Sequence, residues 1–219
     1  MDELFKAVRA VHICFGGVAL VIAPLAMITL KGGLWHRRWG KIYFWSMAGV
    51  ALTALAMCWL KSGLFLFLIA VFSFYLALTG YSVLRRKKPD DKASPVDWCA
   101  AVAMLLAGVG LVGLGVFSAD DSQRWVRIVF GIICLLFGAV DIRGFLKPPQ
   151  QYRAWWFTHM TRFLAAYIAT VTAFSTVNFQ FLPYLVRWLW PTAIGTVGII
   201  VWRIYYARKF AGRRSVAKP

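Results

Sequence analysis

The chain is poor in acidic residues and in charged residues of every kind. Only eight of its 219 residues are Asp or Glu, and Asp, Glu, Lys and Arg together make up 15%. A soluble domain carries about 25% charged residues, so this composition excludes an ordinary soluble enzyme. Four cysteines are present, and none belongs to a C-x-x-C pair. Their spacing argues against a disulfide scaffold, a zinc site or an iron–sulfur cluster.

Apolar side chains are in excess, at 61% of the residues and a mean hydropathy of +0.67. Seven runs reach the length of about 20 residues that a helix needs to cross the hydrocarbon core of a bilayer. They cover residues 8–30, 42–60, 64–84, 96–117, 126–145, 154–179 and 182–202. The runs are continuously apolar and do not alternate, which favours helices over a barrel. The sequence therefore predicts an all-α, polytopic membrane protein, with one seven-helix transmembrane domain over residues 1–219.

Basic residues predict the orientation of this bundle. The 25 Lys and Arg residues give a net charge of +17. Most of them lie in residues 31–41, 85–92, 143–153 and 208–218. These segments follow the first, third, fifth and seventh apolar runs, so they all fall on the same side of the membrane. The positive-inside rule then places the N-terminus outside and the C-terminus in the cytoplasm. The expected partners are the lipid bilayer and its anionic inner-leaflet lipids, and no nucleic acid, because no folded basic module is present.

One motif imitates a dinucleotide-binding loop. Residues 108–113 read G-V-G-L-V-G, which matches the pattern G-x-G-x-x-G. That pattern binds a pyrophosphate only between a strand and the start of a helix. Here it lies inside the fourth apolar run. With Gly115 it predicts a face of small residues for close helix packing.

A cluster of polar side chains inside the predicted spans is the main candidate site. Asp141 lies late in the fifth run, and His159 and Arg162 share one face early in the sixth. Charged groups at membrane depth cost about 2.5–3.5 kcal/mol each on insertion scales, so they are expected to face the protein interior. The candidate ligand-binding residues are Asp141, His159 and Arg162 with three residues of the first cytoplasmic loop, His36, Arg37 and Arg38.

This cluster has two interpretations. An Asp141–Arg162 pair that holds two helices together, with His159 hydrogen-bonded nearby, is the structural one. A site for an anionic or protonatable ligand is the functional one. Arg9 and His12 form a second candidate polar site at the outer end of the first run.

The histidines leave a haem or metal site open as an alternative. Haem needs two side chains that face one iron, or one ligand and an open position. Two histidine pairs could bind haem b, namely His159 with His36 and His159 with His12. By helix rise and bilayer thickness, His12 and His159 differ in depth by about 15 Å.

Several short motifs resemble a bacterial family of multi-pass membrane proteins of unknown function. The first part of the resemblance lies in His12, Gly16, Ala23-Pro24 and residues 33–40 with His36-Arg37-Arg38. The second part lies in His159, residues 167–169, residues 172–174, Asn178, Leu182-Pro183, residues 190–192 and Ile194-Gly195. The resemblance implies a seven-helix protein of the bacterial inner membrane, and it implies no reaction or ligand.

The residues thus predict a membrane protein that binds or transports a small anionic or protonatable ligand at the cytoplasmic half of the bundle. The first alternative is a haem- or metal-binding redox protein. The second is a non-catalytic subunit or assembly factor within a membrane complex or a homo-oligomer. The His-x-x-x-His pairs expected of membrane metallohydrolases are absent, and the sequence leans towards a protein that is not an enzyme without deciding the question.

Overall fold

The structure is a computed structural model that describes residues 1–61, 63–151 and 153–216, and Lys218 of the predicted basic tail lies outside this range. The described residues form seven α-helices and one short 3-10 turn, η1, at Val83–Arg85. The helices are α1 (Asp2–Ile28), α2 (Leu34–Lys61), α3 (Leu64–Ser82), α4 (Pro95–Val116), α5 (Asp121–Leu146), α6 (Ala154–Asn178) and α7 (Tyr184–Val216). All seven are long and apolar enough to cross a membrane, as expected for a multi-pass membrane protein.

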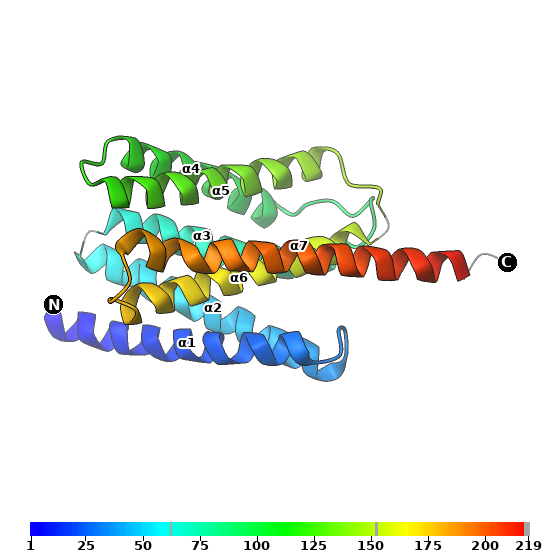
Figure 1. The fold of residues 1–219 in the computed structure, drawn as a ribbon, viewed down its shortest axis with the longest axis horizontal. Helices are drawn as coiled ribbons and strands as arrows, with labels where there is room; N and C mark the ends of the chain where they lie inside the picture. The colour runs from blue at the N-terminus through cyan, green and yellow to red at the C-terminus, as the bar shows by residue number, and fades with distance from the viewer. Residues whose placement is uncertain (62, 152, 217–219) are drawn as a thin grey trace.

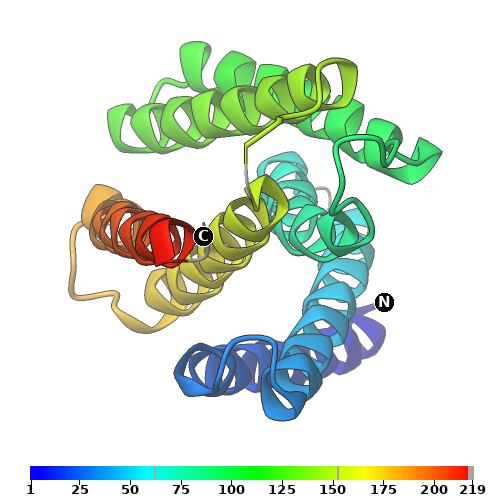
Figure 2. The same ribbon diagram turned by 90° about the vertical axis from the view of Figure 1, so that its right-hand side faces the viewer.

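The helices run side by side along the long axis of the molecule (Figure 1). Seen along this axis, α3 and α6 lie in the middle, the α1–α2 pair on one side and the α4–α5 pair on the other (Figure 2). The connections α1–α2, α3–α4 and α5–α6 lie at the same end, where α7 also leads to the C-terminus (Figure 1). We call this end the basic end, because it holds the Lys- and Arg-rich segments.

Several helices extend beyond the apolar runs that predicted them. α2 begins at Leu34, ahead of the predicted start at residue 42, and α7 continues to Val216, beyond residue 202. Hydropathy detects only the apolar part of a helix, whereas Arg, Lys and Trp prolong it through the headgroup region. His36, Arg37 and Arg38 were therefore wrongly placed in a loop, since they lie in the first turns of α2.

Local sequence signals begin the helices of the α4–α5 pair. Ser94 accepts a hydrogen bond from the Asp97 backbone N–H, and the Asp97 carboxylate accepts one from the Ser94 backbone, which completes a capping box. Pro95 occupies the first turn, as its fixed φ favours. Asp120 caps α5 through the Gln123 backbone N–H. The start of α4 follows the Ser94-Pro95 signal in the sequence, whereas α5 begins at Asp121, ahead of the predicted residue 126.

The glycines of residues 108–115 pack against other helices, with one exception. A Cβ atom built on Gly108 would lie 3.0 Å from the Gly131 carbonyl oxygen of α5, and one on Gly115 would lie 3.0 Å from that of Arg124. Gly110 contacts Leu68 of α3. Gly113 has nothing within 4 Å, so it takes no part in the predicted contact. Close approach of the α4 and α5 backbones is what the small residues allow.

Candidate functional site

The structure divides the predicted polar cluster between two neighbouring places beside α6. Arg162 pairs with Asp141 between α5 and α6. His159, one turn earlier on α6, makes its hydrogen bond and ring contacts with Gly80, His36 and Phe163. The two histidines line a cavity at the basic end, and Asp141 and Arg162 do not.

Asp141, Arg162 and Tyr75 form a buried ion-pair network that joins α3, α5 and α6. Arg162 Nη2 donates to Asp141 Oδ1 at 2.6 Å, and the Tyr75 hydroxyl donates to Asp141 Oδ2. Arg162 is 3% exposed and Asp141 9%. Each carboxylate oxygen therefore has a donor, which offsets much of the cost of burying the charge.

Aromatic rings complete the surroundings of Arg162. Its guanidinium carbon lies 4.1 Å from the ring centroid of Phe137, within the range of a cation–π contact. Nη2 also donates to the Phe137 carbonyl oxygen at 3.4 Å. Nη1 is buried without a hydrogen-bond partner among the described residues. The charge is thus balanced by Asp141 and by the ring, and the network holds three helices together.

His159 is fixed by the end of α3. Its Nδ1 lies 2.8 Å from the Gly80 carbonyl oxygen. Gly80 belongs to the last turn of α3, where carbonyl groups lack partners within the helix. A Cβ atom on Gly80 would lie 2.7 Å from the Phe163 ring and 3.0 Å from Arg162 Cβ. The absence of a side chain at Gly80 therefore lets α6 approach closely enough for this hydrogen bond.

His36 is fixed in the same way by the end of α1. Its Nδ1 lies 2.9 Å from the carbonyl oxygen of Ala26, in the last turn of α1. Lys31 donates to the carbonyl oxygens of Ala26, at 3.4 Å, and Met27. A cation at a helix C-terminus also opposes the negative end of the helix dipole. Burial lowers the pKa of Lys31 from its ordinary value, because the surroundings favour the neutral amine.

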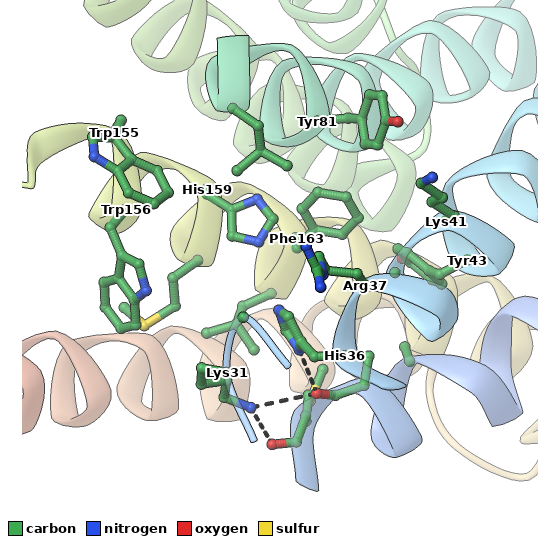
Figure 3. A pocket seen from close by; sticks show the side chains of 18 of the residues that line it. Lys31, His36, Arg37, Lys41, Tyr43, Tyr81, Trp155, Trp156, His159 and Phe163 are labelled. Atoms are coloured by element: carbon green, nitrogen blue, oxygen red, sulfur yellow. Dashed lines mark hydrogen bonds between the residues drawn. The ribbon is translucent and has the colours of Figure 1, made fainter. Parts of the chain in front are cut away.

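The two histidine rings face each other across the cavity (Figure 3). Their centroids are 6.3 Å apart, and their planes make an angle of 76°. Because a carbonyl oxygen only accepts hydrogen bonds, each Nδ1 carries a proton, and in the neutral ring each Nε2 then carries a lone pair. The described hydrogen bonds of His36 and His159 engage Nδ1 alone. Both lone pairs are thus available to a ligand.

The cavity around this pair is cationic and aromatic. We call it the basic-end cavity, and its volume is about 400 Å³. Its basic lining residues are Lys31, His36, Arg37, Lys41, Lys87 and His159. Its aromatic lining residues are Tyr43, Tyr81, Trp155, Trp156, Phe163 and Trp202. No Asp or Glu occurs among the described residues that line it.

Three of the predicted site residues lie elsewhere. The Arg38 guanidinium lies 5.3 Å from the Trp35 ring centroid, and Arg38 does not line the cavity. Arg9 is exposed. His12 Nδ1 contacts the Thr53 hydroxyl at 2.9 Å and the Val50 carbonyl at 3.2 Å, which ties α1 to α2. The structure therefore brings His36, but not His12, against His159.

Sequence reasoning missed most of the cavity wall. In the sequence, Lys31, Lys41 and Lys87 indicate only the membrane orientation, and Trp155 and Trp202 indicate only the boundary of the bilayer. Cations that fix topology and cations that bind a ligand have the same composition, so spacing could not separate them. One signal was available, namely Lys31 and Lys41 at either side of His36 in a short segment.

Comparison with known proteins adds no relative. No protein-family model, no curated protein and no solved structure matches this chain. The function is therefore argued from the site alone.

Proposed function

We propose that the protein binds a small organic anion in the basic-end cavity, an acidic head on an apolar body. The observation that supports this proposal is the set of basic side chains without an acidic partner in the cavity wall. Cations that converge on one space without an acidic partner repel one another, and an anion relieves that repulsion. Lys and Arg at the rim supply the charge-assisted hydrogen bonds that a carboxylate or phosphate accepts.

The rest of the wall favours a ligand with an apolar body. Trp155, Trp156, Phe163 and Trp202 present rings to the cavity. A volume of about 400 Å³ is within the range of pockets that bind organic ligands. A bare inorganic anion would leave these rings without a partner.

The location of the acidic residues supports the same proposal. Asp141 pairs with Arg162, and Asp97 lies 3.5 Å from Arg86. Lys6 pairs with Glu3 at 2.7 Å on the exposed first turn of α1. These acids lie away from the cavity. Asp90 and Asp91 line an adjoining pocket together with Lys87, so a ligand is the expected counter-charge of Lys31, Arg37 and Lys41.

Octyl phosphate is a suitable probe, because it combines an acidic head with an apolar chain. The protein is placed in nanodiscs of phosphatidylcholine and titrated with octyl phosphate, octanol and inorganic phosphate, with empty nanodiscs as the blank. We expect octyl phosphate to bind more tightly than either of the other compounds, as measured by calorimetry. Nanodiscs that contain phosphatidic acid separate the two sources of ligand, since an anionic lipid in the cavity would suppress this binding.

Arg37 and Arg38 provide a matched pair of variants, because they are neighbours and only Arg37 lines the cavity. Arg37→Gln should weaken the binding of octyl phosphate by about tenfold, the worth of one charge-assisted hydrogen bond. Arg38→Gln should bind as the wild type does. Equal effects of the two substitutions, or equal binding of octanol and octyl phosphate, would overturn the proposal.

We further propose that the basic end faces the cytoplasm, with the N-terminus outside. The distribution of Lys and Arg supports this orientation through the positive-inside rule. The test is a cysteine placed at Ser94 in a background without Cys14, Cys58, Cys99 and Cys134, of which Cys14 and Cys99 are exposed. A membrane-impermeant thiol reagent should label it only after the cells are opened. Labelling on intact cells would reverse the orientation.

A further inference from the structure

We infer that the ligand of the basic-end cavity is an iron porphyrin whose iron is bound by His36 and His159. This inference rests on the proposed function, because a porphyrin with two carboxylates is an organic anion with an apolar body. It names the class of ligand, and it adds bonds between the iron and two histidine nitrogens, which an organic anion without a metal would not form.

The geometry of the two imidazole rings carries the inference. Their centroids are 6.3 Å apart, and the rings point toward each other from α2 and α6 (Figure 3). Metal–nitrogen bonds to imidazole are about 2.0–2.1 Å long, so one metal between two opposed rings holds their centroids about 6 Å apart. The observed spacing therefore leaves room for one metal ion between the two rings.

The tautomer of both rings is the one that a metal requires. His36 Nδ1 donates to the Ala26 carbonyl and His159 Nδ1 to the Gly80 carbonyl. Histidines that bind metals characteristically donate the other ring N–H to a carbonyl or carboxylate, which fixes the ring and leaves one lone pair for the metal. Two such lone pairs directed into one space repel each other unless an electrophile lies between them.

The number of protein ligands selects a porphyrin over a bare metal ion. A protein zinc site uses three or four side-chain ligands. No group of three or more His, Cys, Asp or Glu side chains suited to a metal occurs in the described part of the chain. An iron porphyrin brings its own four nitrogens and needs only the two axial positions from the protein. The histidine pair therefore fits haem and is too small for a zinc site.

The side chains of the cavity wall have the chemistry that the remainder of the ligand requires. The Phe163 ring packs against His159 with centroids 4.9 Å apart and planes tilted by 55°, and Trp155, Trp156 and Trp202 add apolar surface. Lys31, Arg37, Lys41 and Lys87 offer charge to the two porphyrin carboxylates. Iron held by two histidines has no open coordination position, so the bound haem is not a site where a further small molecule binds iron.

The test is a titration of the protein in phosphatidylcholine nanodiscs with haemin, followed by absorption and electron paramagnetic resonance spectroscopy. We expect one haem per chain, with a sharpened Soret band and a low-spin signal from two imidazoles. His36→Ala and His159→Ala should each lose the low-spin signal. His12→Ala is the matched control and should keep it, because His12 contacts Thr53 and Val50 of α2 instead.

Two further variants keep the test decisive where an alanine variant fails to fold. His159→Met retains an axial ligand, and it should bind haem with a shifted spectrum. His159→Gly supplied with free imidazole should recover the low-spin signal of the wild type. A low-spin signal that survives in both alanine variants would overturn the assignment of the ligands.

The failure of this inference differs from the failure of the proposed function. Binding of octyl phosphate by the wild type without binding of haemin would overturn the porphyrin and leave the organic anion in place. Failure to bind either compound would overturn both. Displacement of octyl phosphate by haemin would support both, since it places the two ligands in the same cavity.

Discussion

The ion-pair network and the basic-end cavity both contain buried or partly buried basic side chains, but these side chains have different roles. In the network, Arg162 and Asp141 are buried, and the carboxylate has a donor on each oxygen. In the cavity, Lys31, Arg37 and the other basic residues have no acid beside them in the described wall. A charge with an opposite charge beside it stabilises the fold, whereas a charge without one favours the binding of an oppositely charged ligand. Loss of a charge should therefore affect stability in the network and binding in the cavity.

The largest effect is expected from breaking the network. Asp141→Ala leaves the Arg162 guanidinium buried without its counter-charge, which costs about 3–5 kcal/mol of unfolding free energy. Unfolding in mixed micelles with increasing sodium dodecyl sulfate measures this difference. The double variant Asp141→Leu with Arg162→Met should lose less than either single change, since neither charge is left behind. A loss below about 1 kcal/mol for Asp141→Ala would remove the structural role of the network.

A smaller effect is expected at the third member of the network. Tyr75→Phe keeps the ring and removes only the hydroxyl that donates to Asp141 Oδ2. A hydrogen bond to a charged group contributes about 1.5–3 kcal/mol, so the unfolding free energy should fall by that amount. The same unfolding assay measures it. Tyr81→Phe is the matched control on the same helix and should cost less, and equal losses would contradict the contribution of Tyr75.

The smallest effect on stability is expected in the cavity. Lys41→Gln removes one of several like charges that have no partner there, so the unfolding free energy should change by no more than about 0.5 kcal/mol. The sign is expected to be neutral or stabilising, because repulsion is reduced. Binding of octyl phosphate should weaken in the same variant. A loss of stability comparable with that of Tyr75→Phe would mean that the two regions do not differ in the way described.

Ionic strength sharpens the same contrast without a substitution. The cavity cations Arg37, Lys41 and Lys87 are exposed, so an increase in salt of about tenfold should screen them and weaken the binding of octyl phosphate. The ion pair of Asp141 and Arg162 is buried and is screened much less. The stability lost in Asp141→Ala should therefore be the same at both salt concentrations, and a loss that vanishes at high salt would contradict the burial argument.

The sequence predicted the pairing of Asp141 with Arg162 as one of two interpretations, and the structure contains that ion pair. The reason is energetic, since one buried acid and one nearby buried base in adjacent helices have few other ways to offset their cost. His159 was grouped with them because it lies three residues from Arg162. Two side chains three residues apart on a helix point in directions that differ by about 60°. This difference is enough for His159 and Arg162 to contact different neighbours. The spacing of these residues in the sequence therefore could not predict that they belong to two separate sites.

The partner of His159 shows the same limit in another way. His36 lies more than a hundred residues away in the chain, and the sequence also offered His12, at a depth that differs from that of His159 by about 15 Å. The choice depends on how α1, α2, α3 and α6 pack, and above all on Gly80, which brings α6 against the end of α3. Long apolar runs carry no information about which helices become neighbours.

The sequence by itself determined that seven apolar helices are present, where α4 begins, and that α4 has a face of small residues. These features follow from hydropathy, capping and side-chain size, which act within one segment of the chain. The tertiary structure alone decided that His36 faces His159 and that the surrounding cations have no acid beside them. In a membrane, every helix is apolar on nearly all sides, so its neighbours are chosen by shape and by the few polar groups that must find partners, and only the assembled bundle contains that information.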